Sequence, residues 1–87
     1  MKIKYEFAIS EVAGEKVAVS VGVMDRNMVI TLNHTAELFF SALAQDISFE
    51  DLVATLMEAY EDLDESTARA DTEEFLQLLR DNDLLDE

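Results

Sequence analysis

Hydrophobic and polar positions alternate in the front third of the chain and predict three β-strands. In residues 2–10 the alternation puts four bulky side chains on one face, namely Ile3, Tyr5, Phe7 and Ile9. Residues 16–23 have a valine at every second position, and the run MVITL (residues 28–32) forms a third apolar segment. Gly14 lies between the first two segments, and MDRN (residues 24–27) between the last two. Such short turns between successive strands predict an antiparallel meander.

From Asn33 onward the apolar positions recur with a helical period and predict three helices. Asn33 or Thr35 can cap the first helix, and Ser48, with an acidic residue three positions later, begins the second. Asp64 can cap the third helix, and Asn82 is suited to a left-handed stop at its end. The inner stripe of this third helix consists of Ala68, Thr72, Phe75, Leu76 and Leu79. The order βββααα predicts an α+β fold in which a small antiparallel sheet packs against three helices, with Leu84 and Leu85 folding back to close the core.

Length and charge restrict the classes of function. The 87 residues form one domain (1–87), and a chain of this size has little room for a deep cavity. Twenty acidic residues against six basic ones give a net charge of −14, which disfavours nucleic acid and anionic membranes and favours basic partners. The absence of Cys removes disulfide and thiolate chemistry, and no apolar run is long enough to span a membrane. We therefore expect a cytoplasmic protein.

No set of residues predicts catalysis or a bound cofactor. His34 is the only histidine and has no second ligand at a suitable spacing. The hydroxyl residues match no nucleophile motif, and catalysis by carboxylates alone would need a cleft that shifts their pKa values. The sequence therefore predicts a protein that is not an enzyme and needs no cofactor.

Two acidic-protein classes are weaker alternatives. Residues 62–73 match the spacing of a calcium loop at four positions, which hold Asp62, Asp64, Ser66 and Glu73. Thr67 stands where the loop needs Gly, and Arg69 stands where it needs an apolar residue, so the start of a helix is the simpler interpretation and no metal site is expected. Acyl carrier proteins are similar in size and acidity, but they are all-helical and neither Ser48 nor Ser66 has their sequence context.

The run MVITL has no Lys, Pro or bulge that would protect an edge strand. If Met28, Ile30 and Leu32 face the helices, Val29 and Thr31 face solvent. The strand can be an ordinary core strand covered by a neighbour. It can also be a docking edge, where an extended peptide pairs with the free backbone groups while flanking pockets select its side chains.

The back two-thirds of the chain resembles the PqqD-like family of RiPP recognition elements, which act in pathways that modify ribosomally made peptides. The similarity covers the runs VITLNHTAELFFSAL, ISFEDLVATLMEAY and LDESTARADTEEFLQLLRDNDLL. The matching positions, in chain order, are Leu32, Asn33, Thr35, Ala36, Phe39, Phe40, Ser48, Leu52, Leu56, Tyr60, Asp71, Phe75, Leu76, Leu79, Leu84 and Leu85. Asp46 and Asp83 stand where the family usually has Gly, and these departures concern the geometry of two loops.

The resemblance implies a winged-helix-like, leader-peptide-binding domain in natural product biosynthesis. Such a domain is a non-catalytic peptide chaperone: it binds the leader of a precursor peptide by strand addition and presents it for post-translational modification by a maturase, often a radical S-adenosylmethionine (SAM) enzyme. Carried onto this chain, the leader would pair with the third strand, formed by Met28, Val29, Ile30, Thr31 and Leu32. The third helix would supply the other wall through Arg69, Thr72, Phe75, Leu76 and Leu79, and Arg69 could hold an acidic residue of the leader.

Two further expectations follow from this interpretation. The excess of carboxylates suggests that the leader or the maturase brings Lys or Arg, so that salt should weaken binding. The alternative to a leader-binding protein is a generic winged-helix interaction module that docks on another protein without presenting a peptide.

Overall fold

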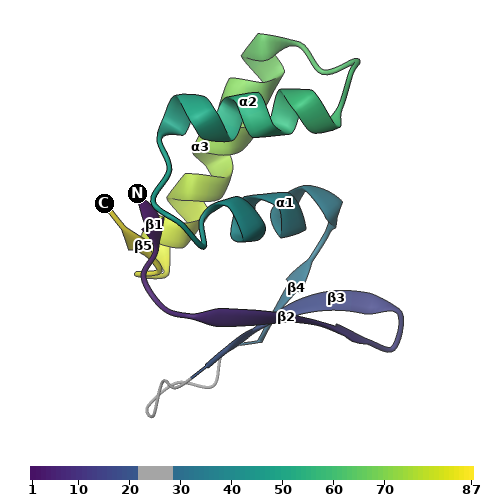
Figure 1. Cartoon of the computed structure of the whole chain (residues 1–87), viewed down its shortest axis with the longest axis vertical. Coiled ribbons are helices and arrows are strands. Elements are labelled where there is room, and N and C mark those ends of the chain that lie inside the picture. The colour runs from purple at the N-terminus through teal and green to yellow at the C-terminus, as the bar shows by residue number, and fades with distance from the viewer. Residues whose placement is uncertain (22–28) are drawn as a thin grey trace.

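The computed structural model describes residues 1–21 and 29–87, and its main sheet and three helices follow the predicted order (Figure 1). They are β1 (Lys2–Ile3), β2 (Phe7–Val12), β3 (Glu15–Ser20), β4 (Val29–Leu32), α1 (His34–Ala42), α2 (Phe49–Ala59), α3 (Glu65–Asp81) and β5 (Leu85–Asp86). Strands β2, β3 and β4 form an antiparallel sheet in that order, which confirms the predicted α+β class with a three-stranded meander before three helices. The turn predicted at residues 24–27, and Met28, lie outside the described residues.

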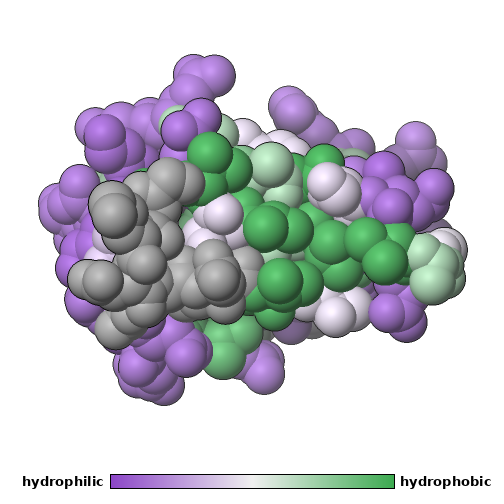
Figure 2. All heavy atoms as spheres, turned by 90° about the horizontal axis from the view of Figure 1, so that it is seen from below, coloured by the Kyte–Doolittle hydropathy of each residue, from purple (hydrophilic) through white to green (hydrophobic). Residues whose placement is uncertain are grey.

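The register of the sheet decides which side chains meet the helices. Ile9 and Ile30 are both paired with Ala18, which is fully buried in the core with Leu32 and Phe40. Val29 and Thr31 are exposed, so the predicted orientation of the third strand is confirmed over residues 29–32. The side of the molecule on which the sheet lies has a band of hydrophobic side chains (Figure 2).

The predicted first strand, residues 2–10, is wrong as one continuous strand. The chain bends at Lys4 and Tyr5, and only β2 joins the main sheet. β1 pairs instead with β5 at the far end of the sequence, and the Lys4 N–H donates to the Leu84 carbonyl at 2.7 Å. The alternation of residues 2–10 is local and has no information about this distant partner, so the sequence could not predict the break.

All three helices begin at predicted caps. The side chain of Asn33 accepts a hydrogen bond from the Ala36 N–H at 2.8 Å, and Ser48 accepts one from the Asp51 N–H at 3.1 Å. Asp64 accepts one from the Thr67 N–H at 2.7 Å, which lowers the pKa of its carboxyl because the bond favours the ionised form. Each bond satisfies a backbone donor that the first helical turn leaves free.

The end of α3 differs from the prediction by one residue. Asn82 has φ −101°, and the left-handed residue is Asp83, with φ 56°. The Leu84 N–H donates to the Leu79 carbonyl at 2.8 Å and the Asp83 N–H to the Arg80 carbonyl at 3.0 Å, which is the Schellman arrangement. Leu79 and Leu84 are both buried, and their packing sets the position of the stop one residue later than Asn82.

The helices cover one side of the sheet. In Figure 1, α1 lies between the sheet and α2, and α3 runs behind them toward β1 and β5. The core between these layers contains the apolar side chains Phe39, Leu43, Leu52, Leu56, Leu76 and Leu79, all almost fully buried. None of the described helices is both long and apolar enough to cross a membrane.

The hairpin between β2 and β3 gives a test of this backbone geometry. Val12 pairs with Glu15 across a two-residue turn in which Ala13 has φ 53° and Gly14 has φ 84°, as a type I′ turn requires. A left-handed alanine is strained by about 1 kcal/mol relative to asparagine or glycine. We predict that Ala13→Asn raises the free energy of unfolding by roughly that amount, measured as a higher urea midpoint at unchanged slope.

Gly14→Ala is the matched control for this hairpin. Its added Cβ would meet no atom within 4 Å, so any loss of stability reports the backbone conformation alone. Equal urea midpoints for the native chain and both variants would contradict a type I′ turn.

Candidate functional site: a groove between β4 and α3

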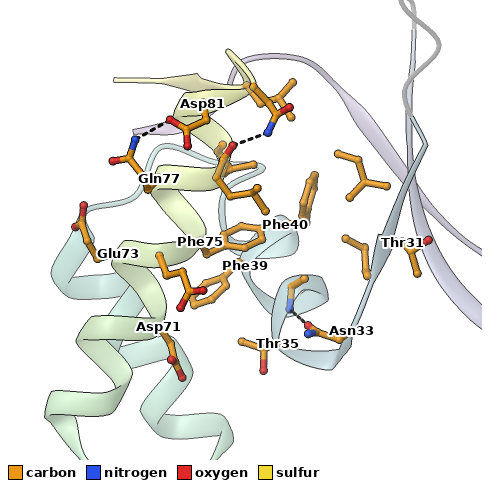
Figure 3. A pocket seen from close by; sticks show the side chains of 18 of the residues that line it. Thr31, Asn33, Thr35, Phe39, Phe40, Asp71, Glu73, Phe75, Gln77 and Asp81 are labelled. Carbon is orange, nitrogen blue, oxygen red and sulfur yellow. Dashed lines mark hydrogen bonds between the residues drawn. The ribbon is translucent and has the colours of Figure 1, made fainter.

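A groove of about 1290 Å³ separates β4 from α3 (Figure 3). Residues 29–32 of β4 form one wall, and the exposed side of α3 forms the other. The floor comes from α1, from the inner side of α3 and from the segment after α3, through Phe39, Phe40, Phe75, Leu79 and Leu84. The groove is therefore an open channel with an apolar floor, bounded by a strand on one side and a helix on the other.

Three phenylalanines give the floor a rigid shape. The rings of Phe39 and Phe75 stack with centroids 4.8 Å apart, and Phe40 meets Phe75 edge-on at 5.8 Å. Phe7, from β2, packs edge-on against Phe40 at 5.4 Å and joins the cluster to the sheet. These offset and edge-to-face contacts are the arrangements that aromatic rings prefer. The half-buried Phe75 presents apolar surface to the groove, and the others support it.

The β4 wall offers backbone groups for pairing. β4 pairs with β3 along one edge and is the last strand of the described sheet, so its other edge borders the groove. In an antiparallel strand every second residue directs its N–H and C=O away from the neighbouring strand. No charged residue or proline occupies residues 29–32, so this edge has none of the usual devices that prevent another strand from pairing.

The α3 wall is acidic. The groove is lined by the carboxylates of Asp71, Glu73, Glu74 and Asp81, whereas none of its described lining residues is Lys, Arg or His. Glu73 pairs with Arg80 at 3.0 Å, and the Asp81 carboxylate accepts a hydrogen bond from the neutral Gln77 amide at 2.9 Å. The arrangement can hold an extended chain by backbone pairing on one side and attract positive charge on the other.

The structure places six of the nine described residues predicted for peptide contact along this groove: Val29, Ile30, Thr31, Leu32, Phe75 and Leu79. The tenth, Met28, lies outside the described residues. The remaining three, Arg69, Thr72 and Leu76, do not line it. The Thr72 hydroxyl is fully buried and donates to the Ala68 carbonyl at 2.7 Å, and Leu76 is 1% exposed in the core.

Arg69 is held at α2 rather than at the groove. Its guanidinium donates to both carboxylate oxygens of Glu50, at 2.8 and 2.7 Å, and lies 5.3 Å from the centre of the Phe49 ring. The hydrogen bonds from Arg69 lower the pKa of the Glu50 carboxyl because they favour its ionised form. Arg69 therefore fastens the start of α3 to the start of α2 and is not placed to hold an acidic residue of a peptide in the groove.

Sequence analysis missed the groove side of α3. The stripe defined by residues 68, 72, 76 and 79 packs inward, whereas Asp71, Glu74 and Leu78 are exposed and line the groove. Leu78 is 54% exposed, and a large apolar residue outside the inner stripe is the signal that could have identified this flank.

The residues that were considered as a metal ligand, a catalyst or a calcium loop have structural roles instead. The Tyr60 hydroxyl lies 2.9 Å from Nδ1 of His34 and 3.3 Å from the Thr35 hydroxyl, and so links the end of α2 to the start of α1. Asp64 caps α3 and the helix runs on from Glu65, so residues 62–73 do not form a calcium loop. Within residues 1–21 and 29–87 no group of three or more His, Cys, Asp or Glu side chains could hold a metal ion.

Comparison with known proteins gives one match. A family model described as "Coenzyme PQQ synthesis protein D (PqqD)" matches residues 15–85, which include β3, β4 and all three helices. No curated protein and no solved structure matches the chain.

Two adjacent leucines on α3, Leu78 and Leu79, differ greatly in burial. Leu79 is 2% exposed, so we predict that Leu79→Ala lowers the free energy of unfolding by about 2–5 kcal/mol. Leu78 is exposed on the same helical turn and lines the groove, so Leu78→Ala should change the free energy of unfolding by no more than about 0.5 kcal/mol. Urea unfolding of the two variants measures both values, and a loss at Leu78 comparable to that at Leu79 would mean that the groove side of α3 is packed rather than open.

Proposed function

Because the chain belongs to the PqqD family, we propose that it recognises the leader of a ribosomally made precursor peptide and presents it to a maturase. Members of this family are non-catalytic accessory proteins. Membership implies that the chain binds a peptide and works together with the enzyme that matures this peptide. In this proposal residues 1–87 act as one recognition domain that makes and breaks no covalent bond.

The observation that carries the proposal is the unprotected edge of β4 beside an apolar channel. A leader entering the groove extends the sheet by one strand, with its backbone paired to residues 29–32. Its side chains on one face of the new strand pack on the floor formed by Phe75 and Leu79. Backbone pairing supplies affinity that does not depend on leader sequence, and the floor and the α3 wall supply the selection.

The binding set differs from the one expected from sequence. Residues 29–32, Phe75 and Leu79 are retained, and Asp71, Glu74 and Leu78 replace Arg69, Thr72 and Leu76 as the contributions of α3. Thr72 and Leu76 are buried in the core, and Arg69 pairs with Glu50 of α2 outside the groove lining.

Presentation requires that the leader stay accessible while it is bound. In this proposal only part of the precursor occupies the groove, and the rest of the precursor extends out of it. The maturase proposed to receive it is a radical SAM enzyme, which would act on the core region of the precursor outside the groove.

A titration of isotopically labelled protein with the leader of a short peptide encoded beside its gene tests recognition. We predict chemical-shift changes at the amides of residues 29–32 and along the groove side of α3. Leu78→Ala should weaken binding, because it removes exposed apolar contact area without unfolding the protein, whereas Arg69→Ala should leave the affinity unchanged. Shift changes confined to α2, or equal losses in both variants, would rule out the groove as the binding site.

A maturation assay tests presentation. With the maturase encoded nearby, we predict that precursor modification slows when the protein is omitted and is restored by the native chain but only weakly by the Leu78→Ala variant. Full restoration by this variant at limiting protein would favour the alternative, an interaction module that docks on the enzyme without carrying a peptide. The Val12→Thr variant, which changes an exposed apolar residue outside the groove lining, is the control.

A further inference from the structure

We infer that the groove selects a basic, amphipathic peptide strand in which two Lys or Arg residues, four positions apart, flank an apolar residue at the middle position. This inference rests on the proposed function and names the class of peptide that the same site accepts. The proposed occupant is an extended segment with the pattern basic–x–apolar–x–basic, and the charges and dimensions of the groove support this pattern.

The first observation is a pair of uncompensated carboxylates on the α3 wall. Asp71 and Glu74 are exposed, line the groove and have no hydrogen-bond or ion-pair partner among the described residues. They are three residues apart, so their side chains are neighbours on one face of the helix. In Figure 3, Asp71 lies at the end of the groove where Thr35 and Asn33 are found. This end offers a site for one cationic side chain.

The second observation is a further carboxylate near the opposite end. Asp81 is exposed and lines the groove, and among the described residues its hydrogen-bond partner is the uncharged Gln77 amide, so no described cation neutralises its negative charge. Figure 3 shows Asp81 toward the opposite end of the groove from Asp71, with the phenylalanines between them. The α3 wall therefore has acidic ends and an apolar middle.

The spacing of these groups matches a strand. Asp71 and Asp81 are ten positions apart in the helix, which corresponds to about 15 Å along the axis. A β-strand rises about 3.4 Å per residue, so four residues span about 14 Å. Residues i, i+2 and i+4 of a strand point to the same face. Basic residues at i and i+4 can therefore reach the two acidic ends while the residue at i+2 lies over Phe75.

The floor explains why the middle residue is apolar. Phe75 stacks on Phe39 and meets Phe40 edge-on, so this part of the groove offers aromatic surface with no charged group in the cluster. A charged side chain placed there would lose hydration without gaining a partner. The pattern reads the same in both directions along the peptide, so it holds whether the added strand is parallel or antiparallel to β4.

Two synthetic peptides of identical composition and charge test the pattern. In Ac-SKTFTKS-NH2 both lysines share a strand face with the phenylalanine, whereas in Ac-STKFKTS-NH2 they lie on the opposite face. Nuclear magnetic resonance titration up to millimolar peptide should shift the amides of residues 29–32 and of Asp71, Glu74 and Leu78 with the first peptide. The second should bind about fivefold more weakly, the factor expected when two solvent-exposed ion pairs are lost, and Ac-SETFTES-NH2 should cause no shift.

Paired charge variants assign the effect to the groove. Asp71→Asn with Glu74→Gln should weaken binding of the first peptide severalfold and reduce its advantage over the second. Glu58→Gln with Glu61→Gln changes the net charge equally at exposed positions outside the groove lining and should leave both affinities unchanged. Raised salt should weaken binding of the first peptide to the native protein and have less effect on the groove variant.

Three outcomes of these experiments would contradict the inference. Equal affinities for the two lysine peptides, no shift with either, or equal losses in the two double variants would overturn it. The leader encoded beside the gene separates this failure from that of the proposed function. If that leader shifts the amides of residues 29–32 while the designed peptides do not discriminate, the groove binds leaders without the proposed pattern. If neither the leader nor the designed peptides shift these amides, the proposed function fails as well.

Discussion

The hydrogen bond from the Ala36 N–H to the Asn33 side chain is the constraint on which the site depends. Asn33 is the single residue between β4 and α1, so this cap fixes the direction in which the chain leaves the strand. The chain turns into α1 and places Phe39 and Phe40 beneath the groove instead of adding another strand beside β4. The free edge and the apolar floor are thus two consequences of one local turn.

The opposite wall depends on packing between distant parts of the chain. Phe75 stacks against Phe39, and the Schellman end at Asp83 directs Leu84 and Leu85 back into the core. β5 then pairs with β1, so both ends of the described chain hold the C-terminal half of α3 in place. The position of the α3 wall is set by this ladder and by the buried side of α3, which consists of Ala68, Thr72, Leu76 and Leu79.

The net charge of −14 affects both the stability of the folded state and the chemistry of the groove. Like charges on a small surface repel one another and disfavour the compact state. Four of the six basic side chains are engaged in ion pairs with carboxylates, namely Lys4, Lys16, Arg69 and Arg80. The carboxylates of Asp71 and Glu74 are left without described partners where they border the groove. That location makes the acidity a property of the groove as well as of the solvated surface, and a basic peptide bound there would relieve the repulsion.

The sequence by itself determined that three strands precede three helices, that Ser48 and Asp64 are caps, how β4 is oriented and how acidic the molecule is. It narrowed the first cap to Asn33 or Thr35. Each of these depends on bonds between near neighbours, on a simple periodicity or on composition. Only the tertiary structure decided that residues 2–10 divide between two sheets, that Asp83 rather than Asn82 is left-handed, and which flank of α3 lines the groove. One helix presents residues 69, 72 and 76 on one side and residues 71, 74 and 78 on another. The choice between these sides is made by the tertiary packing of α3 against α1 and α2, and the periodicity within α3 has no information about that packing.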